Sequence, residues 1–258
     1  MLSAWPSNIA KRFKPQSVEY AKARCRLAEW RASWEAVRNR QVKNFLALEL
    51  LAAGTPMLLM GDEVRRTQRG NNNAYCHDSD ISWFDWSLLE RHRDIHRFVK
   101  ELNAFRQRRD VVEGKALSLN QLLNQARIEW HGVMLKHPDW SNHSHSLAFT
   151  LRSLHARFLL HGMLNAYWEP LTFELPPVPA EFPQAWRRCI DTALKPPDDI
   201  YPWETAAAVG QATYVVQPRS VVLLALALEG SSGMLPQGTL TRSSEEPASS
   251  GLASVRKT

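Results

Sequence analysis

The stretch 54–86, GTPMLLMGDEVRRTQRGNNNAYCHDSDISWFDW, is the most informative part of this 258-residue chain. It opens with the apolar run Met57–Met60, which follows a Thr-Pro pair and precedes Gly61. Because proline biases the residue before it towards extended backbone, this run predicts a short strand rather than the continuation of a helix. Short continuous apolar runs are typical of strands buried in parallel sheets. We therefore predict a buried strand at 57–60 within an α/β arrangement.

A dense group of polar side chains follows this predicted strand. Ligand sites in α/β proteins lie in the loops at the carboxyl ends of parallel strands. Amide groups that both donate and accept hydrogen bonds, beside flat aromatic faces, match the hydroxyl edges and the C–H face of a sugar. The alternative is a loop that folds on itself, with its amides bonded to its own backbone. The predicted sugar-binding residues are Asn71, Asn72, Asn73, Tyr75, Asp78 and Asp80, with Trp83 and Trp86 as further aromatic faces.

The sequence of residues 54–86 resembles the segment after the eighth barrel strand of bacterial glycogen debranching enzymes. These enzymes are the isoamylase-type members of the α-amylase family of glycoside hydrolases. The preceding residues 38–54, RNRQVKNFLALELLAAG, resemble the helix between strands seven and eight of that barrel. The resemblance implies a remnant of a (β/α)8 barrel and an enzyme that hydrolyses α-1,6 branch linkages in glycogen or another branched α-glucan. In that family Glu63 corresponds to a glutamate that braces the end of strand eight.

The catalytic carboxylates of such an enzyme are not matched in this chain. Glycoside hydrolysis by a retaining enzyme needs two carboxyl groups about 5–5.5 Å apart across one glycosidic bond. Asp62 and Glu63 are adjacent, and neighbours on extended backbone point to opposite faces. The family's nucleophile, acid and stabilising aspartate come from strands four, five and seven, upstream of the matched region. We therefore predict no catalytic residue here and no hydrolysis by the chain alone. A non-catalytic β-domain that binds α-glucan or has a structural role is the alternative.

The composition of the chain bears on nucleic-acid binding, membrane binding and the cellular compartment. The net charge of +6 is concentrated near the N-terminus, where residues 1–34 carry seven basic and two acidic side chains, and no nucleic-acid-binding motif accompanies them. The three cysteines are odd in number and widely spaced, which favours a reducing compartment. No run of about eighteen apolar residues and no signal peptide is evident. We expect a cytoplasmic protein that binds neither nucleic acid nor membrane, with its oligomeric state open.

No metal or other cofactor is expected. His92 and His96 stand four apart on a predicted helix, a spacing that can chelate a metal, but a zinc site needs at least three protein ligands and no third is evident. Five further histidines lie within 131–161, and alternation along strands predicts that they are divided between two faces and serve ordinary packing. These five are His131, His143, His145, His155 and His161.

Two helices are predicted before residue 110. The first runs from an N-cap at Ser33 to Ala53, with Gly54 as its C-terminal stop. Its predicted apolar stripe consists of Val37, Gln41, Phe45, Leu48 and Ala52, widened by Leu46, Leu50 and Leu51. The second helix spans 88–109, with one face formed by Leu88, Arg91, Ile95, Phe98, Val99, Leu102 and Phe105.

From Arg127 onward the hydrophobic period changes from helical to alternating. Six short runs rich in β-branched and aromatic residues are separated by Gly, Pro, Asp and Ser, as in an antiparallel β-sandwich. The runs are ARIEWHGVML, HSLAFTLRS, ARFLLHGMLNA, LTFEL, QATYVV and RSVVLLALAL. The same region resembles the C-terminal β-domain of the debranching enzymes.

The resemblance begins abruptly near residue 36 and ends near 229, which divides the chain into four parts. Residues 1–35 are a divergent basic segment, 36–114 the C-terminal portion of a (β/α)8 barrel, 115–229 a β-sandwich domain, and 230–258 a disordered tail. A truncated gene, a wrong start or a frameshifted upstream segment would explain the abrupt start, and a divergent amino-terminal helix is the alternative. A barrel strand at 57–60 would lack both sheet neighbours, leaving its backbone unpaired and its apolar faces exposed unless another chain supplied them.

Overall fold

A six-stranded antiparallel sheet is the centre of the fold. The computed structural model describes residues 18–52, 55–112, 115–116, 127–152, 158–182 and 185–227. The strands of the central sheet are β3 (Arg127–His131), β4 (Ser146–Arg152), β5 (Phe158–Asn165), β7 (Trp186–Asp191), β8 (Ala207–Val209) and β10 (Ser220–Ala227). Their spatial order is β3-β4-β5-β10-β7-β8, so the last strand of the chain is inserted between β5 and β7.

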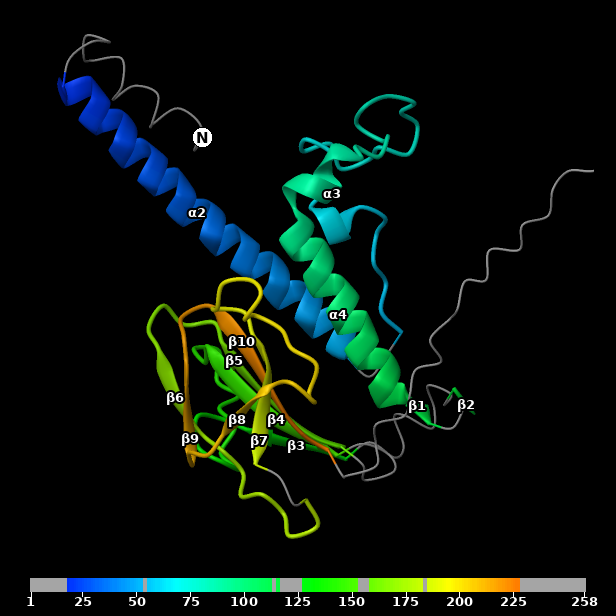
Figure 1. The fold of residues 1–258 in the computed structure, drawn as a ribbon, viewed down its shortest axis with the longest axis vertical. Coiled ribbons are helices and arrows are strands. Elements are labelled where there is room, and N and C mark those ends of the chain that lie inside the picture. The colour runs from blue at the N-terminus through cyan, green and yellow to red at the C-terminus, as the bar shows by residue number, and fades with distance from the viewer. Residues whose placement is uncertain are drawn as a thin grey trace, which may run out of the picture.

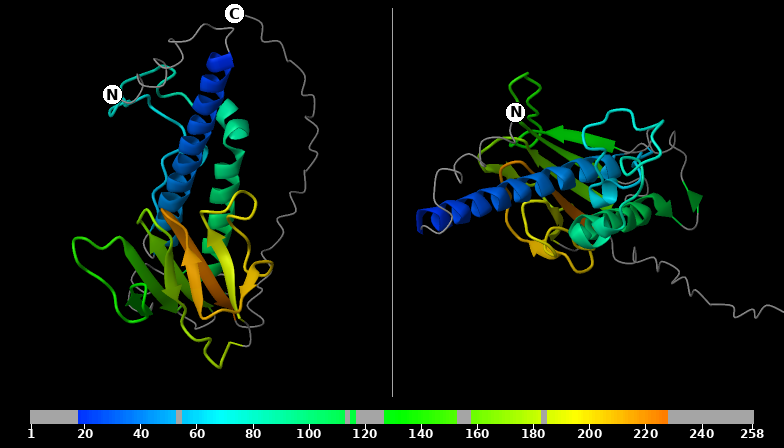
Figure 2. Two further views of the ribbon diagram at one scale, coloured as in Figure 1. Left: turned by 90° about the vertical axis from the view of Figure 1, so that its left-hand side faces the viewer. Right: turned by 90° about the horizontal axis from the view of Figure 1, so that it is seen from above.

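The central sheet is covered on both faces. Two long helices, α2 (Val18–Leu51) and α4 (Arg93–Asp110), lie side by side over one face (Figures 1 and 2). The other face is covered by a two-stranded sheet of β6 (Leu171–Glu174) and β9 (Thr213–Val216). The remaining elements are the 3-10 helix η1 (Asp62–Val64), the short helix α3 (Ser87–Arg91), and the paired strands β1 (Val111–Val112) and β2 (Lys115–Ala116).

Strand β10 shows why its sequence is a continuous apolar run. Val221, Leu223 and Ala225 are buried against the helices. The alternate residues Val222, Leu224 and Leu226 are buried against β6 and β9. Since successive side chains of a strand point to opposite faces, a strand covered on both sides must be apolar at every position.

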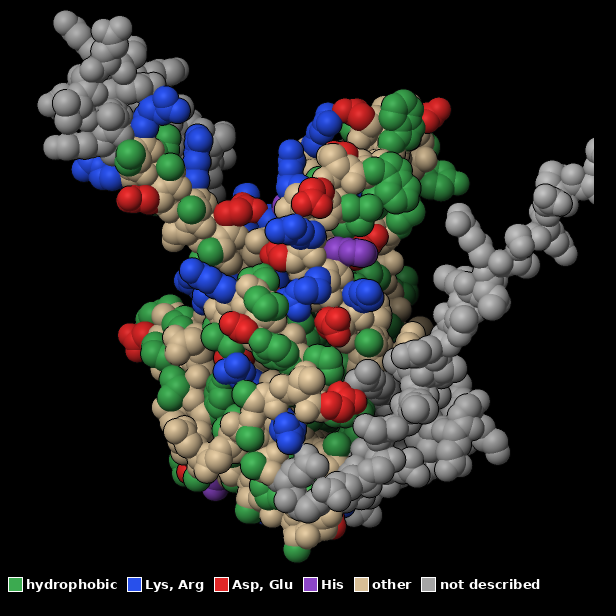
Figure 3. Space-filling view, in the orientation of Figure 1, with side chains coloured by type: hydrophobic (Ala, Val, Ile, Leu, Met, Phe, Trp, Pro, Cys, Tyr) green, Lys and Arg blue, Asp and Glu red, His purple; other side chains and the backbone are tan. Residues whose placement is uncertain are grey.

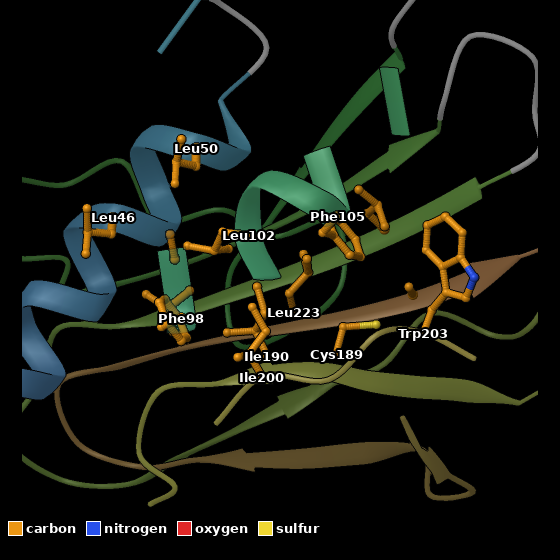
Figure 4. Packing of buried hydrophobic residues seen from close by; sticks show 14 of the residues in the cluster. Leu46, Leu50, Phe98, Leu102, Phe105, Cys189, Ile190, Ile200, Trp203 and Leu223 are labelled. Atoms are coloured by element: carbon orange, nitrogen blue, oxygen red, sulfur yellow. The ribbon is translucent and has the colours of Figure 1, made fainter. Parts of the chain in front are cut away.

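The core between the helices and the sheet contains residues of α2, α4, β5, β7 and β10 (Figure 4). Leu46 and Leu50 from α2, and Phe98, Leu102 and Phe105 from α4, lie over Leu223 of β10. Cys189, Ile190, Ile200 and Trp203 complete the sheet side of this core. The two helices and the sheet therefore share one hydrophobic core.

The first predicted helix is correct in kind but wrong in its start and in its buried face. Helix α2 begins at Val18, so Ser33 is an interior helical residue rather than an N-cap. Phe45 is 71% exposed and Leu48 40% exposed, whereas Leu46, Ala47 and Leu50 are buried. The helix carries more apolar residues than the sheet can cover. Of the predicted stripe, Leu46, Leu50 and Leu51, which were predicted to widen it, are the residues that pack in the core. Gly54, the predicted stop, lies outside the described residues.

The predicted buried strand at 57–60 does not form. The segment has no regular secondary structure and pairs with no strand, and Met57, Leu59 and Met60 are 88%, 58% and 62% exposed. A strand is stabilised by hydrogen bonds to neighbouring strands, and within the described residues no strand precedes Val111. Three of the four apolar side chains of this segment are therefore exposed between α2 and η1.

The second predicted helix is divided at His92 into α3 and α4. Its predicted core positions from Ile95 to Phe105 are confirmed as buried, while Arg91 is exposed. The six alternating runs correspond to β3, β4, β5, β6, β9 and β10. Strands β7 and β8 were not predicted as alternating runs. Antiparallel pairing is confirmed throughout the described sheets.

The proposed division of the chain into 1–35, 36–114, 115–229 and 230–258 stays a prediction. Helix α2 is continuous across residue 35, and the core between helices and sheet combines residues on both sides of residue 114. Residues 230–258 lie outside the described part of the chain. Among the described helices, none combines the length and apolar character needed to cross a membrane.

Candidate functional site

The candidate site is the long loop between α2 and α3 that carries the asparagines. Its entry is a tight turn at Gly61, which has a left-handed φ of 105° and accepts the Arg66 backbone N–H at 2.8 Å. A Cβ at this glycine would lie 2.6 Å from Cβ of Arg66, so the turn excludes other residues. Glu63 accepts the Gly61 N–H at 2.8 Å, which places this side chain in the turn itself.

The three asparagines divide into two structural roles. Asn71 accepts the backbone N–H of Asn73 at 2.8 Å, and Asn73 accepts that of Tyr75 at 3.4 Å. These are local turns in which an asparagine side chain replaces a backbone acceptor. Asn71 Nδ2 also lies 3.2 Å from His77 Nε2. Asn72 is exposed and has no side-chain hydrogen bond to any described residue, so its amide is available to a ligand.

The same loop carries exposed aromatic rings. Tyr75 is 94% exposed, Trp83 60% and Trp86 73%, and Trp86 packs edge-on against Phe84 with ring centroids 4.7 Å apart. Figure 3 shows hydrophobic side chains gathered at the end of the molecule that carries this loop. Trp83 donates its indole N–H to Asp78 Oδ1 at 2.8 Å, so this carboxylate orients the ring.

The last predicted site residue, Asp80, forms an exposed ion pair with Arg69, with Nη2 and Oδ2 2.7 Å apart. Arg69 has a left-handed φ of 53° beside Gly70, which also has positive φ. The ion pair therefore connects Arg69, just before the asparagines, to Asp80, seven residues after them. Asp78 and Asp80 are both engaged with the loop's own side chains, whereas Asn72 and Tyr75 face solvent.

Sequence reasoning missed the contact that anchors this loop to the rest of the molecule. The guanidinium of Arg65 donates to Glu35 and to Asn39, both on α2. Its hydrogen bond holds the pKa of the Glu35 carboxyl below its usual value, against the opposing effect of burial. No local sequence pattern reveals these contacts of Arg65, because Glu35 and Asn39 lie 30 and 26 residues away in the chain.

The described residues include histidines and carboxylates on several elements. Within them, no group of three or more potential metal-ligating side chains lies together. Of the five later histidines, His131 and His161 are buried side by side and joined through the Thr150 hydroxyl, whereas His143 and His145 are exposed. His155 lies outside the described residues. An apolar cavity of about 230 Å³ lies elsewhere, lined by Leu48 of α2 and by residues of β3, β4, β5 and β10.

Comparison with known proteins gives the relatives of this chain. The family model for the C-terminal domain of isoamylases 1–3 matches residues 129–223. Isoamylase 3 of Oryza sativa subsp. japonica, a chloroplastic protein, is 36% identical over 191 residues, which are 73% of this chain but 23% of that relative. The glycogen operon protein GlgX homologue of Mycobacterium tuberculosis is 38% identical over 112 residues, 41% of this chain and 16% of the relative.

Solved structures with the same arrangement are pullulanases. Pullulanase type I from Bacillus subtilis, in complex with maltose, superimposes with a TM-score of 0.54 at 22% identity, covering 76% of this chain and 24% of the pullulanase. The pullulanase of Bacillus acidopullulyticus gives 0.53 at 19% identity, covering 73% and 20%. The chain thus spans about a quarter of the length of the proteins it matches. Residues 129–223 match the C-terminal domain of the isoamylases, and the chain is similar in sequence to isoamylases and to GlgX glycogen operon proteins.

Proposed function

We propose that this chain is a C-terminal part of an α-glucan debranching hydrolase, which cleaves α-1,6 branch linkages in glycogen or a similar polymer. Its relationship to isoamylases and to glycogen operon proteins supports the substrate class. The observation that carries the proposal at residue level is the exposed pair Asn72 and Tyr75, an amide and an aromatic ring. Hydroxyl groups of a glucan would meet the amide, and a C–H face would meet the ring.

The loop acts in this proposal as one wall of a glucan-binding cleft. Asn71 and Asn73 fix the backbone, Asp78 orients Trp83, and Asp80 closes the loop through Arg69. Glu63 braces the turn at the base of the loop. This division assigns the ligand contacts to Asn72 and Tyr75 and makes the remaining predicted residues supports.

We further propose that residues 36–114 are the last helix–strand–helix of a (β/α)8 barrel. The exposed side chains of Met57, Leu59 and Met60 support this, because an unpaired apolar segment acquires its strand partners only when the rest of a sheet is beside it. Nucleophile and general acid would come from that missing sheet. The 258-residue chain is then expected to show no hydrolysis of its own.

The test joins residues 36–229 to the preceding barrel of an isoamylase relative. The joined protein should release new reducing ends from glycogen or a branched limit dextrin, and the 258-residue chain should not. In the joined protein, Asn72→Ala or Tyr75→Ala should lower kcat/KM roughly three- to thirtyfold without changing the melting temperature. Asn71→Ala is the matched control for turn formation, because it should lower stability as well as activity. Variants at 72 and 75 that keep full kcat/KM would show that the loop is only a scaffold.

The second candidate function is binding of α-glucan without catalysis. This function would be favoured if the purified chain binds glucan and the joined protein does not hydrolyse it.

We propose a reducing location such as the cytoplasm. The free thiols of Cys25 and Cys76, which are exposed, and of Cys189, which is buried, support this proposal.

A further inference from the structure

A second cluster of aromatic rings, two of them exposed and one half-buried, lies far along the chain from the asparagine loop. Trp168, in the turn after β5, is 61% exposed, and its ring centroid lies 3.9 Å from that of Tyr167 at an interplanar angle of 33°. His145, just before β4, is almost parallel to Tyr167 at 17°, with centroids 5.9 Å apart, and lies 6.4 Å from Trp168. We call these three residues the aromatic platform. It stands on the sheet domain, at the end where β4 begins and β5 ends.

The aromatic platform is mounted rigidly on a buried asparagine. Asn165, 2% exposed, donates through Nδ2 to the carbonyls of Glu169, Val216 and Gln217 at 2.9, 3.1 and 3.2 Å. Its Oδ1 accepts the Tyr167 backbone N–H at 2.9 Å. The Tyr167 carbonyl in turn accepts the Arg219 N–H at 3.1 Å. The ring-bearing turn is therefore held in one conformation before any ligand arrives, which reduces the entropy lost on binding.

This combination of groups matches a sugar better than it matches an apolar surface. Trp168 and His145 are exposed and Tyr167 is half-buried, and the group carries polar atoms of its own: the Tyr167 hydroxyl and the His145 ring nitrogens, with the exposed Glu169 next to Trp168 in the chain. An apolar partner would bury these groups without hydrogen bonds, which is unfavourable. A pyranose presents a C–H face to the rings and hydroxyl groups to the border, so it satisfies both.

We propose that the aromatic platform is a second α-glucan-binding site, separate from the asparagine loop, in which Trp168 stacks on a glucosyl unit. The choice of α-glucan rests on the proposed function. The site itself is complete within this chain, because all three rings and their support by Asn165 belong to described residues. Its role would be to hold the polymer on the sheet domain while the asparagine loop contacts another segment.

Binding by the whole 258-residue chain tests the proposal. Native affinity electrophoresis in gels containing glycogen gives the dissociation constant, and maltoheptaose serves as the soluble competitor. Trp168→Ala should weaken binding roughly three- to tenfold, and Trp168→Phe should retain most of it because a flat ring remains. Trp140→Ala is the matched control, since Trp140 is 64% exposed on the same domain but packs edge-on against Trp130. Thermal unfolding monitored by circular dichroism should give the same midpoint for Trp168→Ala, Trp168→Phe and Trp140→Ala, because these side chains are exposed.

Each outcome bears on the proposal. A loss in Trp168→Ala that is absent from Trp140→Ala, and that adds to the loss in Tyr75→Ala, supports two separate sites. Unchanged binding in Trp168→Ala, an equal loss in Trp140→Ala, or no retention of the chain by glycogen overturns the platform. These binding results are independent of the hydrolysis test. Trp168→Ala in the joined protein can remove the aromatic platform and leave hydrolysis unchanged. Conversely, an inactive joined protein with normal binding at Trp168 would overturn the proposed hydrolase and leave the platform standing.

Discussion

The ammonium group of Lys43 lies 2.6 Å from the carboxylate of Asp199, and both side chains are almost completely buried. Lys43 belongs to α2, and Asp199 lies between β7 and β8, 156 residues later. Arg97 of α4 donates to the other carboxylate oxygen of Asp199. One buried carboxylate therefore joins both helices to the sheet. A buried charge of this kind is tolerated only because it is paired and hydrogen-bonded.

Removing the carboxylate should destabilise the chain strongly. Asp199→Ala leaves the buried Lys43 ammonium with its longer ion pair to Asp94, at 3.7 Å, and breaking a buried pair costs about 3–5 kcal/mol. Urea unfolding monitored by circular dichroism measures the loss. Glu90→Ala is the control, since it removes an exposed ion pair with Arg93 and should have a much smaller effect. Equal effects of the two substitutions would show that Asp199 does not hold the layers together.

The helices and the sheet should unfold in one transition. Their shared core buries Phe98 and Leu102 of α4 against Leu223 of β10, so neither layer keeps its core without the other. Urea curves from helix ellipticity at 222 nm and from tryptophan emission should therefore coincide. Two separated midpoints would instead support the predicted boundary near residue 115 as a boundary between independently folding domains.

Acid should destabilise the protein through His161. Lys136 donates its backbone N–H to His131 Nδ1 at 2.9 Å, His131 Nε2 lies 2.8 Å from the Thr150 hydroxyl, and that hydroxyl lies 3.0 Å from His161 Nδ1. A neutral His131 therefore carries its proton on Nε2 and Thr150 donates to His161. The remaining nitrogen, Nε2 of His161, is buried and has no hydrogen-bond partner among the described residues.

Burial lowers the pKa of His161 to about 3, and the charge of His131 adds to this effect. The unfolded chain binds a proton near its ordinary value of 6.5 and the folded chain does not, so unfolding takes up protons between pH 6.5 and about 3. Stability is then fully present above pH 6.5 and falls on acidification, by up to about 1.4 kcal/mol per pH unit. His161→Leu should reduce this slope, whatever its effect at neutral pH. An unchanged slope between pH 6.5 and 4.5 would contradict the assignment.

Local patterns predicted those elements whose environment is uniform along their length. The run Ser220–Ala227 is apolar at every position because both faces of β10 are covered, and the strand was predicted correctly. Met57–Met60 has a similar composition but forms no strand, because composition cannot supply neighbours. In α2 the apolar residues outnumber those the sheet can cover, so the pattern alone did not identify Leu46 and Leu50 as the buried ones. The pair of Lys43 and Asp199 depends on a separation in sequence that no local pattern encodes.

The candidate site shows the same limit at the level of single residues. Sequence composition identified the asparagine loop as a unit, and its role in glucan binding stays a prediction. It did not distinguish Asn71 and Asn73, which bond to backbone N–H groups, from the exposed Asn72. All three have the same chemistry, and only the conformation of the loop separates them.

The close approach of Gly162 to Phe149 gives a final prediction. The two residues are paired across β5 and β4, and a Cβ at Gly162 would lie 2.5 Å from two carbons of the Phe149 ring. In Gly162→Ala the ring must tilt and give up its edge-on contact with Trp130, whose centroid lies 6.0 Å away. Overpacking of this kind costs about 1–3 kcal/mol, which urea unfolding would show as a lower midpoint.

Gly210→Ala is the matched control for this prediction. A Cβ there meets nothing within 4 Å, so the substitution should be neutral or raise stability by up to about 1 kcal/mol through the unfolded state. The double variant Gly162→Ala, Phe149→Leu should recover part of the stability lost by Gly162→Ala alone, because the smaller side chain removes the clash. If Gly162→Ala is as stable as the parent, the ring moves into the neighbouring cavity lined by Phe149 and Leu48 at no cost, and Gly162 is not required for packing.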